Sequence, residues 1–289
     1  LKSSSNMKQM RAMLSMAMYE QALKGDVVGL VLKEGLQNSK DAVMGAINAG
    51  TTKEGRIVIT LDEDKRLVRI EDNGIGMLPG VINSAFLAMG GTEKPGLTAA
   101  EVAGGKGLAK MALFSCCKDI DLETTAVVRF DKTIDTANKE NNLKKGDSGY
   151  KNPFIKLDIP KTTTLSDFDP ETLFEAERPV SANTVNAPSN AKNGTDIKFF
   201  ITDTLEKFGK DEKVGFSTYS AMSYLEKTPF LGNIEFVIKE KRSYDDDFVT
   251  KALPIGKNFP YQDYDAPLEV ETDWADIDVY IGKEQKRPF

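Results

Sequence analysis

Two short runs of β-branched residues, followed at once by a glycine-rich motif, constrain the fold of this chain most strongly. Residues 56–61 and 67–70 are rich in Ile and Val, and the polar turn 62–65 joins them, which predicts a β-hairpin. The second run leads directly into Asp72-Asn-Gly-Ile-Gly-Met77. A carboxylate at a strand end followed by two glycines lets the backbone approach a flat ligand closely. The same residues are also good turn formers, so the motif alone leaves a purely structural turn open.

A second motif lies in the helix that we expect over residues 27–47. Glu34, Asn38 and Asp41 are spaced i, i+4 and i+7, so a helix places all three on one face. Such a polar stripe is usually a solvated surface. It also suits a specific chemistry, because an Asn oxygen is a hard ligand for Mg²⁺ and a Glu one turn earlier can take a proton from water.

A third motif is a stretch of six glycines between Gly90 and Gly107, which is typical of a mobile loop. Its last part, Gly104-Gly105-Lys106-Gly107, precedes an apolar helix expected over 108–117. Glycines before a helix expose backbone N–H groups where the helix dipole favours anions. The Gly-Lys-Ser/Thr ending of a P-loop is absent.

The fourth motif is Gly194-Thr195, at the start of a strand expected over 196–201. In this order, the four motifs resemble those of the GHKL superfamily, which includes gyrase B, the ninety-kilodalton heat-shock chaperone, histidine kinases and MutL. Residues 32–42 are similar to the N-box, Asp72 to Met77 to the first glycine box, residues 104–107 to the second, and Gly194-Thr195 to the last. The resemblance covers residues 27–201 apart from 131–192.

The resemblance implies an α+β fold of the Bergerat type, an α/β sandwich with a mixed β-sheet, helices on one face, and ATP held between sheet, helix and lid. It implies that Asp72 binds adenine, that Met77 packs on the base, and that Thr195 supports the adenine site through water. It implies that Asn38 holds Mg²⁺ and that Glu34 polarises the attacking water, with the lid glycines around the phosphates. The full set of implied ATP-binding residues is Asn38, Asp41, Asp72, Gly74, Gly76, Met77, Gly104, Gly105, Lys106, Gly107 and Thr195, with Glu34 as the catalytic residue.

We expect two parts in the chain. Residues 1–204 form the ATP-binding domain, with 131–192 as an irregular insertion. Residues 205–289 form a partial α/β extension, interpreted as the start of a transducer-like domain. In relatives such a domain contributes a lysine to the γ-phosphate, and the candidates here are Lys251, Lys257 and Lys283.

Within the superfamily, Glu34 and the acidic Asp41 resemble the hydrolases more than the histidine kinases, and the chain contains no histidine to phosphorylate. We therefore expect a slow, Mg-dependent ATPase whose turnover drives lid closure and dimerisation within a larger protein. A nucleotide-binding scaffold without turnover is the alternative. A protein kinase of the histidine-kinase type is less favoured.

Composition narrows the remaining classes. The net charge is −6, which disfavours a surface that grips a phosphate backbone over a wide area. No apolar run is long enough for a transmembrane helix, and the two adjacent cysteines are typical of buried thiols in a reducing compartment. We expect a cytoplasmic protein, whose client, a protein or DNA, no motif identifies.

Overall fold

The computed structural model describes residues 27–82, 86, 116–166, 183–207, 210–227, 234–253, 268–271 and 276–279. Met, Leu and Ala residues at helical spacing also predict a helix over residues 7–23. That segment and the glycine-rich motif at 104–107 lie outside the described residues. Within the described part of the chain, no helix has both the length and the apolar character needed to cross a bilayer.

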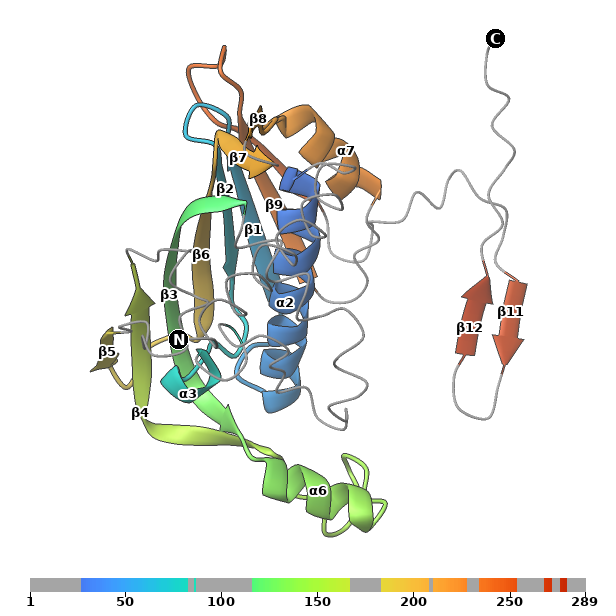
Figure 1. Ribbon diagram of the computed structural model, residues 1–289. Helices are drawn as coiled ribbons and strands as arrows, with labels where there is room; N and C mark the ends of the chain where they lie inside the picture. Colours follow the sequence, from blue (N-terminus) through green and yellow to red (C-terminus); the bar gives the residue numbers. More distant parts are fainter. Residues whose placement is uncertain are drawn as a thin grey trace, which may run out of the picture.

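The centre of the molecule is an eight-stranded sheet with the order β10-β9-β1-β2-β6-β3-β4-β5 (Figure 1). All neighbouring strands are antiparallel except β1 and β9, which run parallel, so the sheet is mixed. The strands are β1 (Gly55–Asp62), β2 (Leu67–Asp72), β3 (Cys117–Phe130), β4 (Phe154–Leu165), β5 (Asn183–Asn186), β6 (Gly194–Ile201), β9 (Ile234–Lys241) and β10 (Val249–Leu253).

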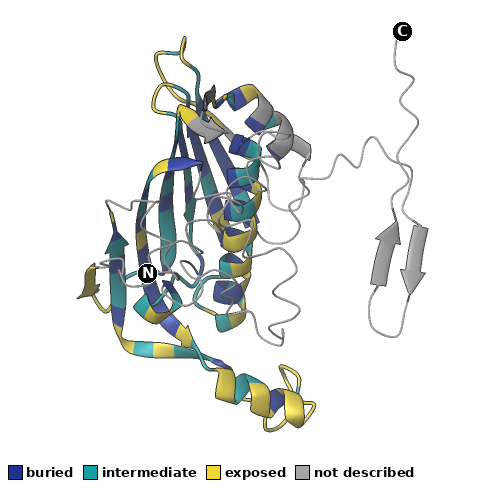
Figure 2. Cartoon of the chain, in the orientation of Figure 1, coloured by how far each residue is buried: buried dark blue, intermediate teal, exposed yellow. Residues whose placement is uncertain are grey.

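Helix α2 (Val27–Ala49) packs against one face of this sheet and contacts β1, β2 and β6. Its apolar residues recur at helical spacing, so Val28, Val31 and Leu32 are fully buried and form the stripe expected of a core-facing helix. Alternate residues of β1, among them Ile57 and Ile59, are fully buried as well (Figure 2). The interface between α2 and the sheet is therefore the hydrophobic core.

Three shorter helices complete the described structure: α3 (Pro79–Val81), α6 (Lys132–Glu140) and α7 (Thr218–Lys227). Helix α7 contacts α2, so it lies on the same face of the sheet (Figure 1). Helix α6 connects β3 to β4 at one end of the sheet. The mixed sheet with helices on one face confirms the predicted α+β fold of the Bergerat type.

The structure departs from the sequence predictions between β3 and β6. A helix was expected up to Cys117, but β3 begins at that residue and pairs with β6 from Cys117 to Thr125. The segment 131–192 was expected to be irregular around one short strand near residues 154–159, but much of it is regular, because it contains α6, β4 and β5. The expected strand is the first half of β4, which continues through a threonine-rich sequence by pairing with β3.

Residues beyond 204 also contribute to the central sheet. Strand β9 pairs with β1 over eight residue pairs, and β10 pairs with β9, although both lie past the domain boundary expected at residue 204. The remaining strands form separate two-stranded sheets, β7 (Thr204–Lys207) with β8 (Lys210–Lys213) and β11 (Leu268–Glu271) with β12 (Asp276–Val279). Lys251 lies in β10, whereas Lys257 and Lys283 lie outside the described residues.

Candidate functional site

Helix α2 presents the polar residues of the predicted N-box beside its buried stripe. Glu34 is half-buried, whereas Asn38 and Asp41 are exposed. Between them lies Ser39, which is buried against the sheet. The helix turns about 100° per residue. Ser39 therefore points into the core, whereas Glu34 and Asn38 lie on the neighbouring, less buried side of α2.

Asp72, at the end of β2, is held by donors from two sides. The Ser39 hydroxyl donates to its Oδ2 at 2.8 Å, and the Gly74 backbone N–H donates to its Oδ1 at 2.9 Å. Burial raises the pKa of Asp72 to about 6, and hydrogen bonds from Ser39, Gly74 and the backbone of Thr195 offset part of that increase. A carboxylate has about four lone-pair positions, so these three donors leave it able to accept from a ligand.

Two threonines continue the row that begins at Asp72. Thr195 of β6 is the cross-strand partner of Asp72, and Thr124 of β3 is the cross-strand partner of Thr195. Directly opposed residues share one face of a sheet, so all three lie on the face that carries α2. The Thr124 and Thr195 hydroxyls are 3.0 Å apart.

The loop after Asp72 runs so close to neighbouring backbone that only glycine fits. Gly76 has a φ of +67°, and a Cβ added there would lie 2.1 Å from the carbonyl oxygen of Thr125. A Cβ on Gly74 would lie 2.6 Å from the Cβ of Ala42 on α2. The two glycines therefore let this loop pass between α2 and β3, which is the close approach that the motif predicted.

Polar side chains from β3 and the start of β6 fasten the same loop. The Met77 backbone N–H donates to the Thr124 hydroxyl at 2.9 Å. The Asn193 side-chain amide donates to the carbonyl of Asn73 at 3.2 Å and also to that of Gly74. Met77 itself is partly buried against the hydrophobic core. The loop is thus tied to the sheet at both of its ends.

Sequence analysis missed three of these residues. Ser39 stands inside the motif quoted for α2, and its i+5 position from Glu34 was the available signal for an inward-facing side chain. Asn193 immediately precedes Gly194, but nothing local indicates that its amide reaches residues 73–74. Thr124 carried no signal, because its partners depend on the order of strands in the sheet.

The residues expected to contact phosphates are only partly described. Gly104, Gly105, Lys106 and Gly107 lie outside the described residues. Among the described residues, no group of three or more His, Cys, Asp or Glu could by itself hold a metal ion. The oxygen donors of Asn38 and Glu34 nevertheless suit Mg²⁺, because this ion commonly takes one or two protein ligands together with water and substrate phosphates.

Comparisons with known proteins bear on this arrangement. Residues 28–170 match the family model described as histidine kinase-, DNA gyrase B-, and HSP90-like ATPase. A solved structure, the 43K ATPase domain of Thermus thermophilus gyrase B in complex with an aminocoumarin, is similar at 15% identity and a TM-score of 0.40. The match covers 78% of this chain and 45% of that one, so the chain spans less than half of the length of that structure.

A search of curated proteins finds no significant match. The family model covers α2, the Asp72 loop and β3, whereas Asn193 and Thr195 of the site lie beyond the matched residues. Through residues 28–170, the chain belongs to the GHKL ATPase superfamily.

Proposed function

We propose that this chain binds Mg-ATP beside α2 and the Asp72 loop and hydrolyses it slowly. Membership of the GHKL superfamily supports ATP binding. The observation that carries the proposal is the half-buried Asp72 carboxylate, which Ser39 and Gly74 orient and which lies in register with Thr195. A fixed acceptor beside a hydroxyl suits the edge of adenine, whose exocyclic amine needs an acceptor.

In this proposal the base lies beside Asp72 and Thr195 and packs on Met77. Gly74 and Gly76 allow the close approach of the loop that carries Met77, since any side chain there would clash with Ala42 or Thr125. The apolar surroundings strengthen the hydrogen bond from the adenine amine, because electrostatic interactions increase as water is excluded. Adenine recognition is therefore the task of β2, β6 and the loop between β2 and α3.

The phosphate end of the site is the task of α2 and the lid. Asn38 would hold Mg²⁺ together with the phosphate oxygens, and the bound ion would neutralise phosphate charge. The half-buried Glu34 would orient a water molecule and accept its proton. Asp41, one turn beyond Asn38, is proposed to support the same edge of the helix.

The glycine-rich residues 104–107 are proposed to close over the phosphates, because their N–H groups gain charged acceptors only when ATP is bound. Lid closure, and pairing of two such domains, would then transmit the nucleotide state to a larger protein. Because β9 and β10 belong to the central sheet, only the part of residues 205–289 that follows β10 is proposed to belong to a transducer-like part. The client of that switch is a protein or DNA. We also propose a cytoplasmic location.

The test is calorimetry with Mg-ATP, run beside phosphate release. Glu34→Ala should retain ATP affinity but lower turnover by about 10²- to 10⁴-fold, the usual loss for a general base. Asn38→Ala should instead lose the Mg-dependent part of binding. Gln37→Ala is the matched control, because Gln37 is an exposed neighbour on α2 outside the motif.

Four outcomes distinguish these functions. Unchanged turnover in Glu34→Ala would refute the role of Glu34. Binding by the parent chain without any phosphate release would favour a nucleotide-binding scaffold, and transfer of the γ-phosphate to a separate protein would favour a kinase. Absence of ATP binding would refute the proposal.

Lid closure has its own measurement. Hydrogen exchange of residues 90–107 should slow when a non-hydrolysable ATP analogue saturates the chain, because backbone N–H groups near 104–107 acquire phosphate acceptors. Equal exchange with and without the analogue would show that this segment is not the lid.

A further inference from the structure

The hydroxyl of Thr124 is the meeting point of three hydrogen-bonding groups. It accepts from the Met77 backbone N–H at 2.9 Å, lies 3.2 Å from the Gly194 carbonyl, and lies 3.0 Å from the Thr195 hydroxyl. Thr124 is 1% exposed, so water does not substitute for these partners. The hydroxyl is thus saturated by protein groups.

Counting protons shows that Thr124 controls what Thr195 can offer. Each hydroxyl has one proton and two lone pairs. If the Thr124 proton goes to the Gly194 carbonyl, the Thr195 proton turns toward Thr124, and Thr195 can only accept from a ligand. If the Thr124 proton goes to Thr195, the Thr195 proton is released and Thr195 can donate to a ligand.

We propose that Thr124 is a positioning residue that sets base specificity by directing the Thr195 hydroxyl, an inference that rests on the proposed function. A 6-aminopurine presents a donor at its amine and an acceptor at N1. Asp72 supplies the acceptor, and the arrangement in which Thr124 donates to Thr195 supplies the donor. A water molecule between Thr195 and N1 would keep the same hydrogen-bond polarity, because it would accept from Thr195 and donate to N1.

A 6-oxopurine reverses both groups, since it has an oxygen at C6 and an N–H at N1. Its oxygen would face the Asp72 carboxylate, and its N–H would require Thr195 to accept. The two residues are direct neighbours across β2 and β6, so one base edge meets both. Discrimination between the two purines therefore depends on the Thr195 proton as well as on the Asp72 charge.

The experiment compares Mg-ATP with Mg-ITP, whose bases differ at C6 and N1, by calorimetry on the full chain. In Thr124→Val the Thr195 hydroxyl loses its neighbour and rotates freely. We expect ATP affinity to fall roughly 3- to 10-fold, the equivalent of one net hydrogen bond. ITP affinity should stay level or rise, so the ATP/ITP ratio narrows. Thr124→Ser, which keeps the hydroxyl, should restore the parent ratio.

A matched control exists one residue along β3. Thr125 makes a similar hydroxyl contact, 2.8 Å from Thr162, but as the next residue in the strand it points to the opposite face. Thr125→Val should therefore leave the ATP/ITP ratio unchanged. Thermal unfolding of each variant checks that it folds, and Thr124→Ala provides a second variant without the hydroxyl.

A structural role alone would weaken ATP and ITP equally, so an unchanged ratio in both Thr124→Val and Thr124→Ala would overturn the inference while leaving ATP binding intact. Failure of Thr124→Ser to restore the ratio would overturn it as well. If the parent chain binds neither nucleotide, the proposed function fails and this inference fails with it.

Discussion

The two ends of the β1–β2 hairpin each hold a buried or half-buried carboxylate, but their surroundings have opposite effects. At the Asp72 end, burial dominates and raises the pKa to about 6. At the turn, burial also disfavours the charge of Glu63, but donors from Thr218 and Ser243 and the charge of Arg242 outweigh it and lower the pKa. Each carboxylate accepts three hydrogen bonds from the protein, but burial outweighs them at Asp72, whereas the donors and the Arg242 charge outweigh burial at Glu63.

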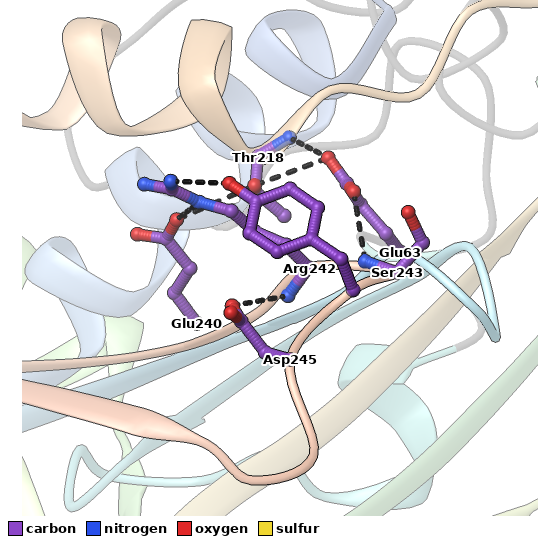
Figure 3. Close-up of polar contacts among 7 residues, drawn as sticks. Glu63, Thr218, Glu240, Arg242, Ser243 and Asp245 are labelled. Atoms are coloured by element: carbon purple, nitrogen blue, oxygen red, sulfur yellow. Dashed lines mark hydrogen bonds and ion pairs between the residues drawn. The ribbon is translucent and has the colours of Figure 1, made fainter.

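The Glu63 end is a network that ties three segments together (Figure 3). Glu63 accepts from the Thr218 backbone N–H at 3.0 Å and from the Ser243 backbone N–H at 3.1 Å. The Thr218 hydroxyl lies 3.1 Å from Glu63 and 3.4 Å from Glu240, and Glu240 also accepts from the Arg242 guanidinium. The network joins the β1–β2 turn to the start of α7 and to the turn after β9.

This difference in pKa distinguishes a carboxylate that stabilises the fold, Glu63, from one that is suited to bind a ligand, Asp72. The donors to Glu63 come from residues far apart in sequence and outweigh the cost of its burial, so its charge stabilises the fold. The donors to Asp72 do not outweigh the cost of its burial, so its charge is costly until a ligand donates to it. A ligand that donates a hydrogen bond to Asp72 would reduce the free-energy cost of its buried charge.

The largest expected effect comes from Gly76→Ala in the Asp72 loop. The change combines a positive φ with a Cβ 2.1 Å from the carbonyl of Thr125, and should lower the free energy of unfolding by more than about 3 kcal/mol. Gly50 is the matched control, since it has a φ of +72° with nothing within 4 Å. Gly50→Ala should cost only about 1 to 2 kcal/mol. Equal costs in urea unfolding would show that the loop can shift to avoid the clash.

Next in size is Asp72→Asn, which should weaken ATP binding by about 2 to 3 kcal/mol, or roughly 30- to 150-fold. The amide loses the charge and can turn its NH₂ toward the adenine amine. Glu63→Gln removes a charge at the other end of the hairpin and should leave ATP affinity unchanged. Calorimetry measures the ATP affinity of both variants. Equal losses of affinity would show that the two ends of the hairpin do not differ in their role in binding.

A smaller effect is the pH dependence of ATP affinity, which we expect from the raised pKa of Asp72. ATP needs the ionised Asp72, so its affinity should be level above pH 7 and fall by up to about tenfold per pH unit below 6. Asp72→Asn should abolish that dependence. A level profile in the parent chain would show that Asp72 is ionised throughout or does not contact the base.

The same pKa shifts predict opposite effects on stability. Because the folded pKa of Asp72 is raised, its contribution to stability is greatest at low pH and is lost as the pH rises through about 6. Because the folded pKa of Glu63 is lowered, its contribution is present above its unfolded pKa and is lost as the pH falls. Urea unfolding of Asp72→Asn and Glu63→Gln between pH 4 and 8 separates the two.

The smallest expected effect is the loss of stability in Glu63→Gln at neutral pH. The amide keeps one acceptor oxygen for Thr218 but presents an NH₂ to the Ser243 N–H, so the loss should be about 1 to 2 kcal/mol. Asp64→Asn is the control, because Asp64 is exposed in the same turn. A larger loss in the control would place the stabilising charge elsewhere in the turn.

Several features of this protein followed from local sequence. The helix expected over 27–47 is α2, and the expected hairpin is β1 and β2, because β-branched runs, short polar turns and apolar helical spacing act over a few residues. The motif from Asp72 to Met77 also contains its own turn, since Gly76 has the positive φ that such a turn needs. Family membership followed from these motifs and their order.

Other features depended on contacts between distant parts of the chain. Strand β9 inserts beside β1 in parallel, although the first paired positions, Gly55 and Ile234, lie far apart in the sequence. Strand β4 runs on through a threonine-rich sequence by pairing with β3.

 The paired positions of β1 and β9 run from Gly55 with Ile234 to Asp62 with Lys241. No local pattern predicts such a partner, because strand pairing is decided by which segments meet in the folded sheet.

The sequence by itself determined the chemical groups of the site: the Asp72 carboxylate, the glycines after it, and the polar residues of α2. The tertiary structure alone decided which groups meet. Ser39 reaches Asp72 because α2 packs on β2, and Thr124 reaches Thr195 because β3 lies beside β6. The physical reason is range: backbone preferences act between near neighbours in the chain, whereas the burial that raises the pKa of Asp72 and the hydroxyl contacts beside it arise only when distant strands assemble into one sheet.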